Sequence, residues 1–151
     1  MGNGYKSEAS YLLCRNKPLS KNATLTIKYK IDVVSGQPDF VAMETNNTPN
    51  SGTVGFIIFH DLTSEFGRFW YNKRLNLDPG TYTLRAPLAD LASWTSVYGK
   101  SANDFPKRFE NILSDAIQVG ITFGGGNHFG HGVRVYGGTA KFTILSAEIE
   151  K

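Results

Sequence analysis

The segment 117–138 constrains the fold of this chain most, because it places two apolar stretches on either side of a glycine-dense corner. Its first half, IQVGITF, carries an apolar side chain at every second position, the period of a strand with one buried face. Five glycines between positions 124 and 132 allow backbone conformations that other residues adopt only with strain. The segment predicts a strand, a corner, a second strand at 133–135, and then a Gly-Gly turn into a last strand.

Four side chains suited to ligand contact lie inside this corner. Asn127, His128 and His131 offer amide or ring hydrogen-bonding groups, and Phe129 adds an aromatic ring. Loops held by a rigid scaffold carry a large share of the binding residues of proteins. The corner is therefore a predicted binding surface, although its sequence names no particular ligand.

The rest of the chain has the pattern of short strands separated by turn residues. Residues 23–34 alternate apolar and polar side chains, and the Ser-Gly-Gln-Pro sequence at 35–38 predicts the end of that strand. Residues 53–60 form a continuous apolar run, which predicts a strand covered on both faces. Further strands are predicted at 66–71, 81–86 and 139–149.

One helix is predicted, near residue 110. Its apolar stripe has the spacing i, i+4, i+7, i+8 and i+11, and Pro106 suits the first turn. The stripe consists of Phe105, Phe109, Ile112, Leu113 and Ala116. About eight or nine short strands and one brief helix predict an all-β fold, an antiparallel β-sandwich of the jelly-roll type, formed as a single domain over residues 1–151.

Composition narrows the classes of partner. The 16 lysines and arginines among 151 residues are scattered, whereas a nucleic-acid binder concentrates them on one face, so no nucleic-acid partner is expected. No apolar run approaches the roughly 18 residues of a membrane span, so no membrane partner is expected either. The first residues lack a signal-peptide pattern, and an extracellular or secreted location is expected only if a leader was trimmed.

Four stretches together carry a family resemblance. They are FWYNKRLNLDPGTYTLRAPL, the segment 94–100, the short amphipathic helix and VGITFGGGNHFGHGV. Their combination is similar to the non-catalytic jelly-roll domains of the galactose-binding-like superfamily, the carbohydrate-binding modules found beside glycan-degrading enzymes. The resemblance covers residues 53–150 and implies a β-sandwich that grips sugar rings and leaves chemistry to a partner domain. Many such modules hold a structural calcium, but no oxygen-rich loop here can be assigned to one, so no cofactor is predicted.

Sugar binding requires exposed aromatic ring faces, and the chain offers three candidates. Trp94 and Tyr98 lie in an irregular segment, and the serine and threonine residues around Trp94 predict that its ring is exposed. Trp70 is the third candidate. Because Trp70 and Tyr71 are neighbours on a strand, they are expected to point to opposite faces.

Polar discrimination would come from side chains near these rings. The candidates are Asn127, His128, Arg134 and Asp61. Together with the three aromatic residues they predict a non-catalytic module that binds a polysaccharide or other glycan.

Two other classes of function stay open. Three histidines and an aspartate could form a metal-dependent or acid–base centre if they converge in space, namely His60, Asp61, His128 and His131. Alternatively, exposed aromatic residues could bury against a second copy of the chain, which would make it a structural, self-assembling sandwich. Neither a nucleophile elbow nor a phosphate-binding loop is present in the sequence.

Overall fold

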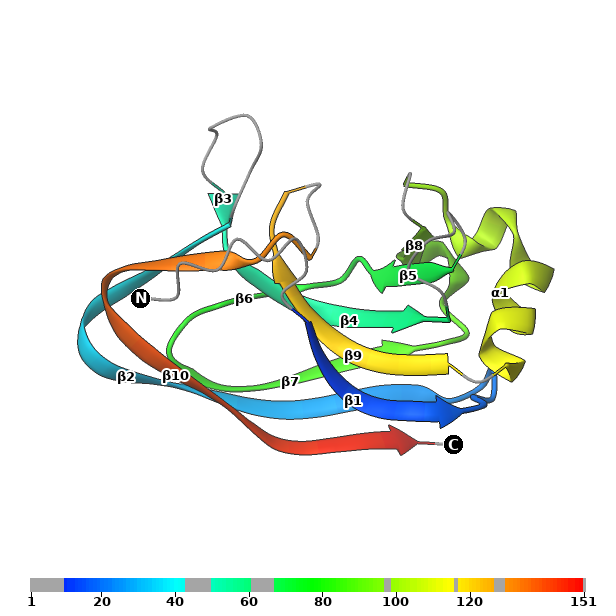
Figure 1. Ribbon diagram of the computed structural model, residues 1–151, viewed down its shortest axis with the longest axis horizontal. Helices are drawn as coiled ribbons and strands as arrows, with labels where there is room; N and C mark the ends of the chain where they lie inside the picture. The colour runs from blue at the N-terminus through cyan, green and yellow to red at the C-terminus, as the bar shows by residue number, and fades with distance from the viewer. Residues whose placement is uncertain are drawn as a thin grey trace.

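The computed structural model describes residues 10–42, 50–60, 67–96, 99–115, 117–126 and 130–150. In this part of the chain two antiparallel sheets pack face to face as a β-sandwich, and in the view of Figure 1 β4 and β5 lie above β7 and above the C-terminal half of β10. This confirms the predicted all-β fold class with its short helix.

The first sheet, called sheet A here, has the strand order β1-β9-β4-β5-β8, and β6 pairs with β4. Its strands are β1 (Ser10–Lys17), β9 (Ile117–Gly124), β4 (Thr53–Phe59), β5 (Arg68–Tyr71), β8 (Trp94–Ser96) and β6 (Leu75–Asn76). The second sheet, sheet B, is built on β2, which pairs with β10 on one side and with β7 and β3 on the other. Its strands are β10 (Val133–Glu150), β2 (Thr24–Ala42), β3 (Asn50–Ser51) and β7 (Gly80–Pro87).

The core lies between the sheets, where the alternation of β2 turns every second side chain inward. The inward residues Leu25, Ile27, Tyr29 and Ile31 are all buried, as the period of two predicted. The prediction for residues 81–86 is confirmed as well, since Leu84 and Ala86 are buried and Thr83 and Arg85 are exposed.

The two longest strands, β2 and β10, do not end where the sequence predicted. Position 36 was expected in a strand-ending turn and positions 137 and 138 in a Gly-Gly turn, but both strands continue through these points, paired with each other. Instead the two-stranded ribbon formed by β2 and β10 contains a β-bulge, where the register shifts between Tyr136 and Gly138. Gly36 has a φ of 65°, and a Cβ atom there would collide with the carbonyl oxygen of Gly137. The glycines therefore bend a continuous ribbon (Figure 1).

The predicted helix is present as α1 (Pro106–Ser114), with Pro106 at its start. Phe109 and Leu113 are buried, and the Phe109 ring meets the Phe69 ring edge-on at 5.1 Å between centroids. Two short 3-10 turns, η1 (Leu91–Ser93) and η2 (Ala102–Asp104), precede the helix. None of the helices in the described part of the chain has the length and apolar character needed to cross a membrane.

Strand β4 is covered on both faces, as its continuous apolar sequence predicted. Phe56 and Ile58 belong to the core between the sheets, whereas Ile57 is buried on the opposite, outer face of sheet A. Ile57 is paired with Trp70 of β5 on that outer face. Sheet A thus carries a second buried layer, outside the main core.

Candidate functional site

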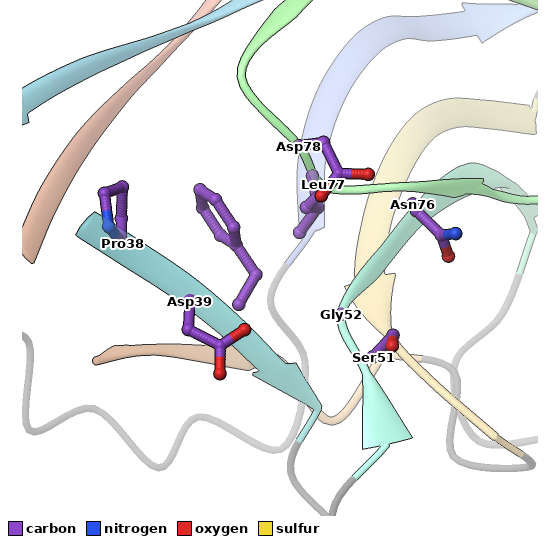
Figure 2. A pocket seen from close by; sticks show the side chains of 8 residues that line it. Pro38, Asp39, Ser51, Gly52, Asn76, Leu77 and Asp78 are labelled. Atoms are coloured by element: carbon purple, nitrogen blue, oxygen red, sulfur yellow. The ribbon is translucent and has the colours of Figure 1, made fainter. Parts of the chain in front are cut away.

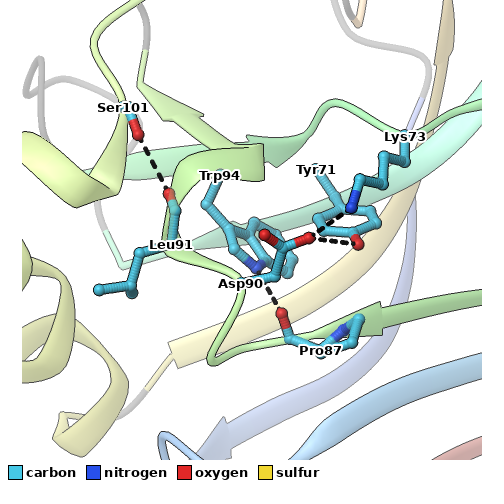
Figure 3. Close-up of polar contacts among 7 residues, drawn as sticks. All are labelled: Tyr71, Lys73, Pro87, Asp90, Leu91, Trp94 and Ser101. Atoms are coloured by element: carbon cyan, nitrogen blue, oxygen red, sulfur yellow. Dashed lines mark hydrogen bonds and ion pairs between the residues drawn. The ribbon is translucent and has the colours of Figure 1, made fainter.

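Trp94 is a core residue, and the prediction that its ring is exposed is wrong. The side chain has a relative exposure of 0% and packs against Tyr71, with 5.0 Å between ring centroids, and Phe109, with 5.9 Å. Its Nε1 donates a hydrogen bond of 3.0 Å to the carbonyl oxygen of Pro87 (Figure 3). Serine and threonine residues beside Trp94 suggested an exposed segment, but side chains alternate along β8. Trp94 faces the core, and the next residue, Thr95, faces the other side of the sheet. A sealed ring cannot stack on a sugar.

The polar groups around Trp94 hold the chain in place. Asp90 accepts hydrogen bonds from Lys73 Nζ at 2.8 Å and Tyr71 Oη at 3.1 Å, and Figure 3 shows the three side chains converging. The hydrogen bond from Lys73 is the main reason that the pKa of Asp90 lies below its ordinary value. These contacts fix the segment between β7 and β8, so we assign them a structural role.

Trp70 is also unsuited to stacking, which corrects the second aromatic prediction. Its relative exposure is 8%, and the Arg68 guanidinium carbon lies 5.3 Å from the ring centroid, in cation–π range. The glycine corner passes close to it, since a Cβ atom at Gly130 would lie 3.9 Å from Trp70 Nε1. Trp70 and Tyr71 do point to opposite faces, as predicted, because Tyr71 belongs to the core and Trp70 does not.

The glycine corner is anchored on β9. The backbone N–H groups of Gly130 and Gly132 both donate to the carbonyl oxygen of Phe123, at 3.1 Å and 3.0 Å. Gly130 has a φ of 84°, which confirms that the corner uses a conformation favoured by glycine. The neighbouring Thr122 hydroxyl is fully buried and has no hydrogen-bond partner among the described residues. Gly130 and Gly132 therefore lie against β9, with Gly130 beside Trp70 on the outer face of sheet A.

The structure does not bring His60 and His131 together. His60 follows the end of β4, and its Nε2 lies 3.6 Å from the Asp115 carboxylate. His131 lies beside Phe123, which pairs with Val54, six residues before His60. At about 3.3 Å per residue the two histidines are roughly 20 Å apart along the strands. Within the described ranges, no three His, Cys, Asp or Glu side chains are grouped as a metal ion would need.

The remaining predicted site residues have different outcomes. Asp61, Tyr98, Asn127 and His128 lie outside the described residues. Arg134 is exposed on β10, opposite Val41 of β2. Of the predicted ligand residues that the structure describes, Arg134 is the one with a solvent-facing side chain.

Arg134 belongs to a surface that the sequence analysis did not identify. At the bent end of sheet B, the register places Arg134 and Tyr136 of β10 beside Val41 and Asp39 of β2, with Ser51 of β3 next in line. Directly paired residues share a face, so these five side chains lie on one face of the three strands. We call this surface the ribbon tip. Tyr136 is 50% exposed, and Asp39, Ser51 and Arg134 are exposed as well.

A small pocket adjoins the ribbon tip and shares two residues with it. Its volume is about 90 Å³, and it lies between the end of β2 and the turn after β6 (Figure 2). Pro38 and Asp39 stand on one side, and Asn76 and Asp78 stand on the other. The lining is formed by Pro38, Asp39, Phe40, Ser51, Gly52, Asn76, Leu77 and Asp78. Tyr136 is directly paired with Asp39, so about 5 Å separates their Cβ atoms, and the ring and the pocket can be reached by one ligand.

This arrangement is chemically suited to binding. An exposed phenol ring, a guanidinium, two carboxylates, an amide and a hydroxyl are the groups that contact sugar hydroxyls and ring faces. Asp39 and Asp78 are both exposed to solvent. A carboxylic acid that works as a general acid near neutral pH is kept in an apolar, desolvated setting. The pair therefore resembles a set of hydrogen-bond acceptors more than a catalytic pair.

The signal for Tyr136 was present in the sequence. In the stretch Val133–Tyr136, the two valines alternate with Arg134 and Tyr136, so Arg134 and Tyr136 share the outer face of any strand formed there. The contribution of Asp39, Asn76 and Asp78 could not be predicted, because it depends on how the bent end of β2 meets β6. Comparison of the chain with family models, curated proteins and solved structures gives no match.

Proposed function

We propose that this protein is a non-catalytic glycan-binding module, and that the glycan lies on the ribbon tip with one substituent in the adjoining pocket. The observation that carries the proposal is Tyr136, a half-exposed aromatic ring beside Asp39 and Arg134. The resemblance of the chain to carbohydrate-binding modules supports the same class of ligand and an extracellular setting beside a glycan-degrading enzyme. The proposal thus places the stacking contact on Tyr136 in place of Trp94 and Trp70, and Tyr98, the third predicted aromatic contact, lies outside the described residues.

The size of the pocket defines what can enter it. A single water needs about 10–15 Å³ of such a cavity, so a volume of about 90 Å³ admits a small group of atoms. Pockets that enclose a whole small ligand measure about 300–1,000 Å³. The pocket can hold one sugar substituent, and the ring itself must rest on the open surface beside it. An elongated glycan fits this arrangement better than a free metabolite.

The charges of sheet B also favour a glycan over a nucleic acid. Its outer face carries basic and acidic side chains together. Lys28, Lys30, Arg85 and Lys141 lie among Asp32, Glu148 and Glu150, with Lys30 Nζ 3.2 Å from Asp32 and Arg85 Nη2 2.9 Å from Glu150. Nucleic-acid binding requires basic side chains that are available to phosphates. Ion pairing within this face leaves a mixed surface in place of a basic one.

Affinity electrophoresis through gels that contain single polysaccharides tests the proposal. Tyr136→Ala should lose retention, because an aromatic contact contributes about 0.5–1.5 kcal/mol beyond burial and its area is lost too. We expect at least a tenfold loss of affinity. Leu145→Ala is the matched control, because Leu145 is 49% exposed on the same strand and lies away from the ribbon tip. The proposal fails if no polysaccharide retards the wild type, or if Tyr136→Ala is retarded equally.

Self-assembly is the second candidate, and one observation favours it. The exposed large apolar residues of the described chain all lie on β2 and β10, and they are Val33, Val34, Tyr136, Leu145 and Ile149. β10 is an edge strand of sheet B in the described structure, and open edges can pair with a second copy. Light scattering should give a dimer for the wild type and a monomer for Leu145→Lys if this candidate is correct. A monomer at all concentrations eliminates it.

A further inference from the structure

The pocket beside the ribbon tip is acidic within a basic chain. The whole sequence has a formal charge of +3, yet the described residues that line the pocket include Asp39 and Asp78 and neither lysine nor arginine. Asn76 and Ser51 add further oxygen atoms to the lining. The pocket therefore presents hydrogen-bond acceptors and negative charge to whatever enters it.

The charge of Asp78 also affects a buried group in the core between the sheets. The Tyr29 side chain is 0% exposed, and its hydroxyl has no hydrogen-bond partner in the described part of the chain. Burial, followed by the nearby Tyr82 and the Asp78 carboxylate, raises the pKa of Tyr29 to about 12. Asp78 is thus close enough for its charge to act on the interior as well as on the pocket.

We infer that the substituent held in this pocket is a protonated amine, and that the ligand is a glycan with free amino sugars. This inference rests on the proposed function and specifies its ligand. An ammonium group has three N–H donors and no acceptor, which matches a wall made of carboxylate, amide and hydroxyl oxygens. Tyr136 then supports the sugar ring that bears the amine.

The charge of other substituents argues against them. An N-acetyl group removes the positive charge and with it the attraction to Asp39 and Asp78. A uronic acid would place a third carboxylate beside Asp39 and Asp78, and like charges repel at this range. A neutral hydroxymethyl group fits, but it gains nothing from the charge. The expected order is free amine first, then neutral and N-acetylated sugars, and acidic sugars last.

Titration calorimetry with two matched oligosaccharides tests the inference. The ligands are a β-1,4-linked glucosamine hexamer and its fully N-acetylated counterpart, at a pH where the amines are protonated and with EDTA present throughout. Coulomb attraction across a few ångströms of water corresponds to about three- to fivefold in affinity per carboxylate at low salt. We expect the glucosamine hexamer to bind roughly tenfold more tightly, and the preference to shrink in about 0.5 M salt.

Three variants locate the effect. Asp39→Asn and Asp78→Asn should each lower the preference for the glucosamine hexamer over its N-acetylated counterpart about three- to fivefold. Asp104→Asn is the control, since Asp104 is exposed in η2, far along the chain from the pocket, and it should change nothing. Equal binding of the two hexamers, or a preference that survives the Asp39→Asn, Asp78→Asn double substitution, overturns the inference. If a neutral polysaccharide is still bound through Tyr136 in that case, the proposed function stands without it.

Discussion

Replacing Trp94 by alanine should destabilise the protein severely. The ring is fully buried between Tyr71 and Phe109, and large-to-small substitutions of such aromatic residues cost about 3–5 kcal/mol. The Pro87 carbonyl also loses its donor. For a chain of 151 residues, 1 kcal/mol corresponds to about 2–4 °C in Tm, so we expect Tm to fall by about 6–20 °C.

Denaturant unfolding followed by circular dichroism measures this loss. Trp94→Phe should fall between wild type and Trp94→Ala, because it keeps most of the ring but leaves the Pro87 carbonyl without its indole donor. Tyr136→Ala is the surface control and should stay within about 0.5 kcal/mol of wild type. A loss below about 1 kcal/mol for Trp94→Ala would refute the assignment of this side chain to the core. Ready quenching of wild-type tryptophan fluorescence by acrylamide would refute it too.

Three further predictions concern the interior and the bent ribbon. Tyr29→Phe should leave Tm unchanged or raise it, because it removes a buried hydroxyl that has no partner among the described residues. Wild type should lose stability as the pH rises from 10 toward 12, because the folded pKa of Tyr29 is raised to about 12 and the contribution of the protonated hydroxyl is complete only below pH 10. Tyr29→Phe should not show this loss. Unfolding curves from pH 8 to 12 check both expectations. Gly36→Ala should lower the free energy of unfolding by about 2 kcal/mol or more, and Gly99→Ala should lower it by less. Both glycines have a positive φ, but only a Cβ atom at position 36 would collide with the backbone of β10. Equal losses would contradict the bend geometry. Asp90→Asn should lower the free energy of unfolding by less than about 1 kcal/mol above pH 4 and have no effect well below it. The pKa of Asp90 is depressed in the folded protein, so its contribution is present above pH 3.8 and is lost as the pH falls through the folded-state pKa. A difference that does not depend on pH would count against the Lys73 contact.

Much of the sandwich could be predicted from local alternation. The inward faces of β2, β7 and β9 follow the period of two, and α1 buries Phe109 and Leu113 of the predicted stripe. These patterns succeed because a sheet face is decided by neighbours two residues apart, a distance that the sequence shows directly.

The errors come from features that depend on distant strands. Gly36 looked like the end of a strand because no local signal shows that Gly137 lies opposite it. Trp94 looked exposed because its neighbours are polar, but Tyr71 and Phe109, which cover it, are 23 and 15 residues away in sequence. The ribbon tip likewise combines β2, β3 and β10. Local sequence predicts to which face of a strand a side chain points more readily than it predicts which residues cover that face.

Mapping a bound glycan by amide chemical shifts is the most direct test of where this protein binds. With the glycan that retards it most in affinity gels, the largest shifts should fall on Asp39, Arg134 and Tyr136, and they should disappear in Tyr136→Ala. Shifts centred on Trp70 and Gly130, on the outer face of sheet A, would contradict the account.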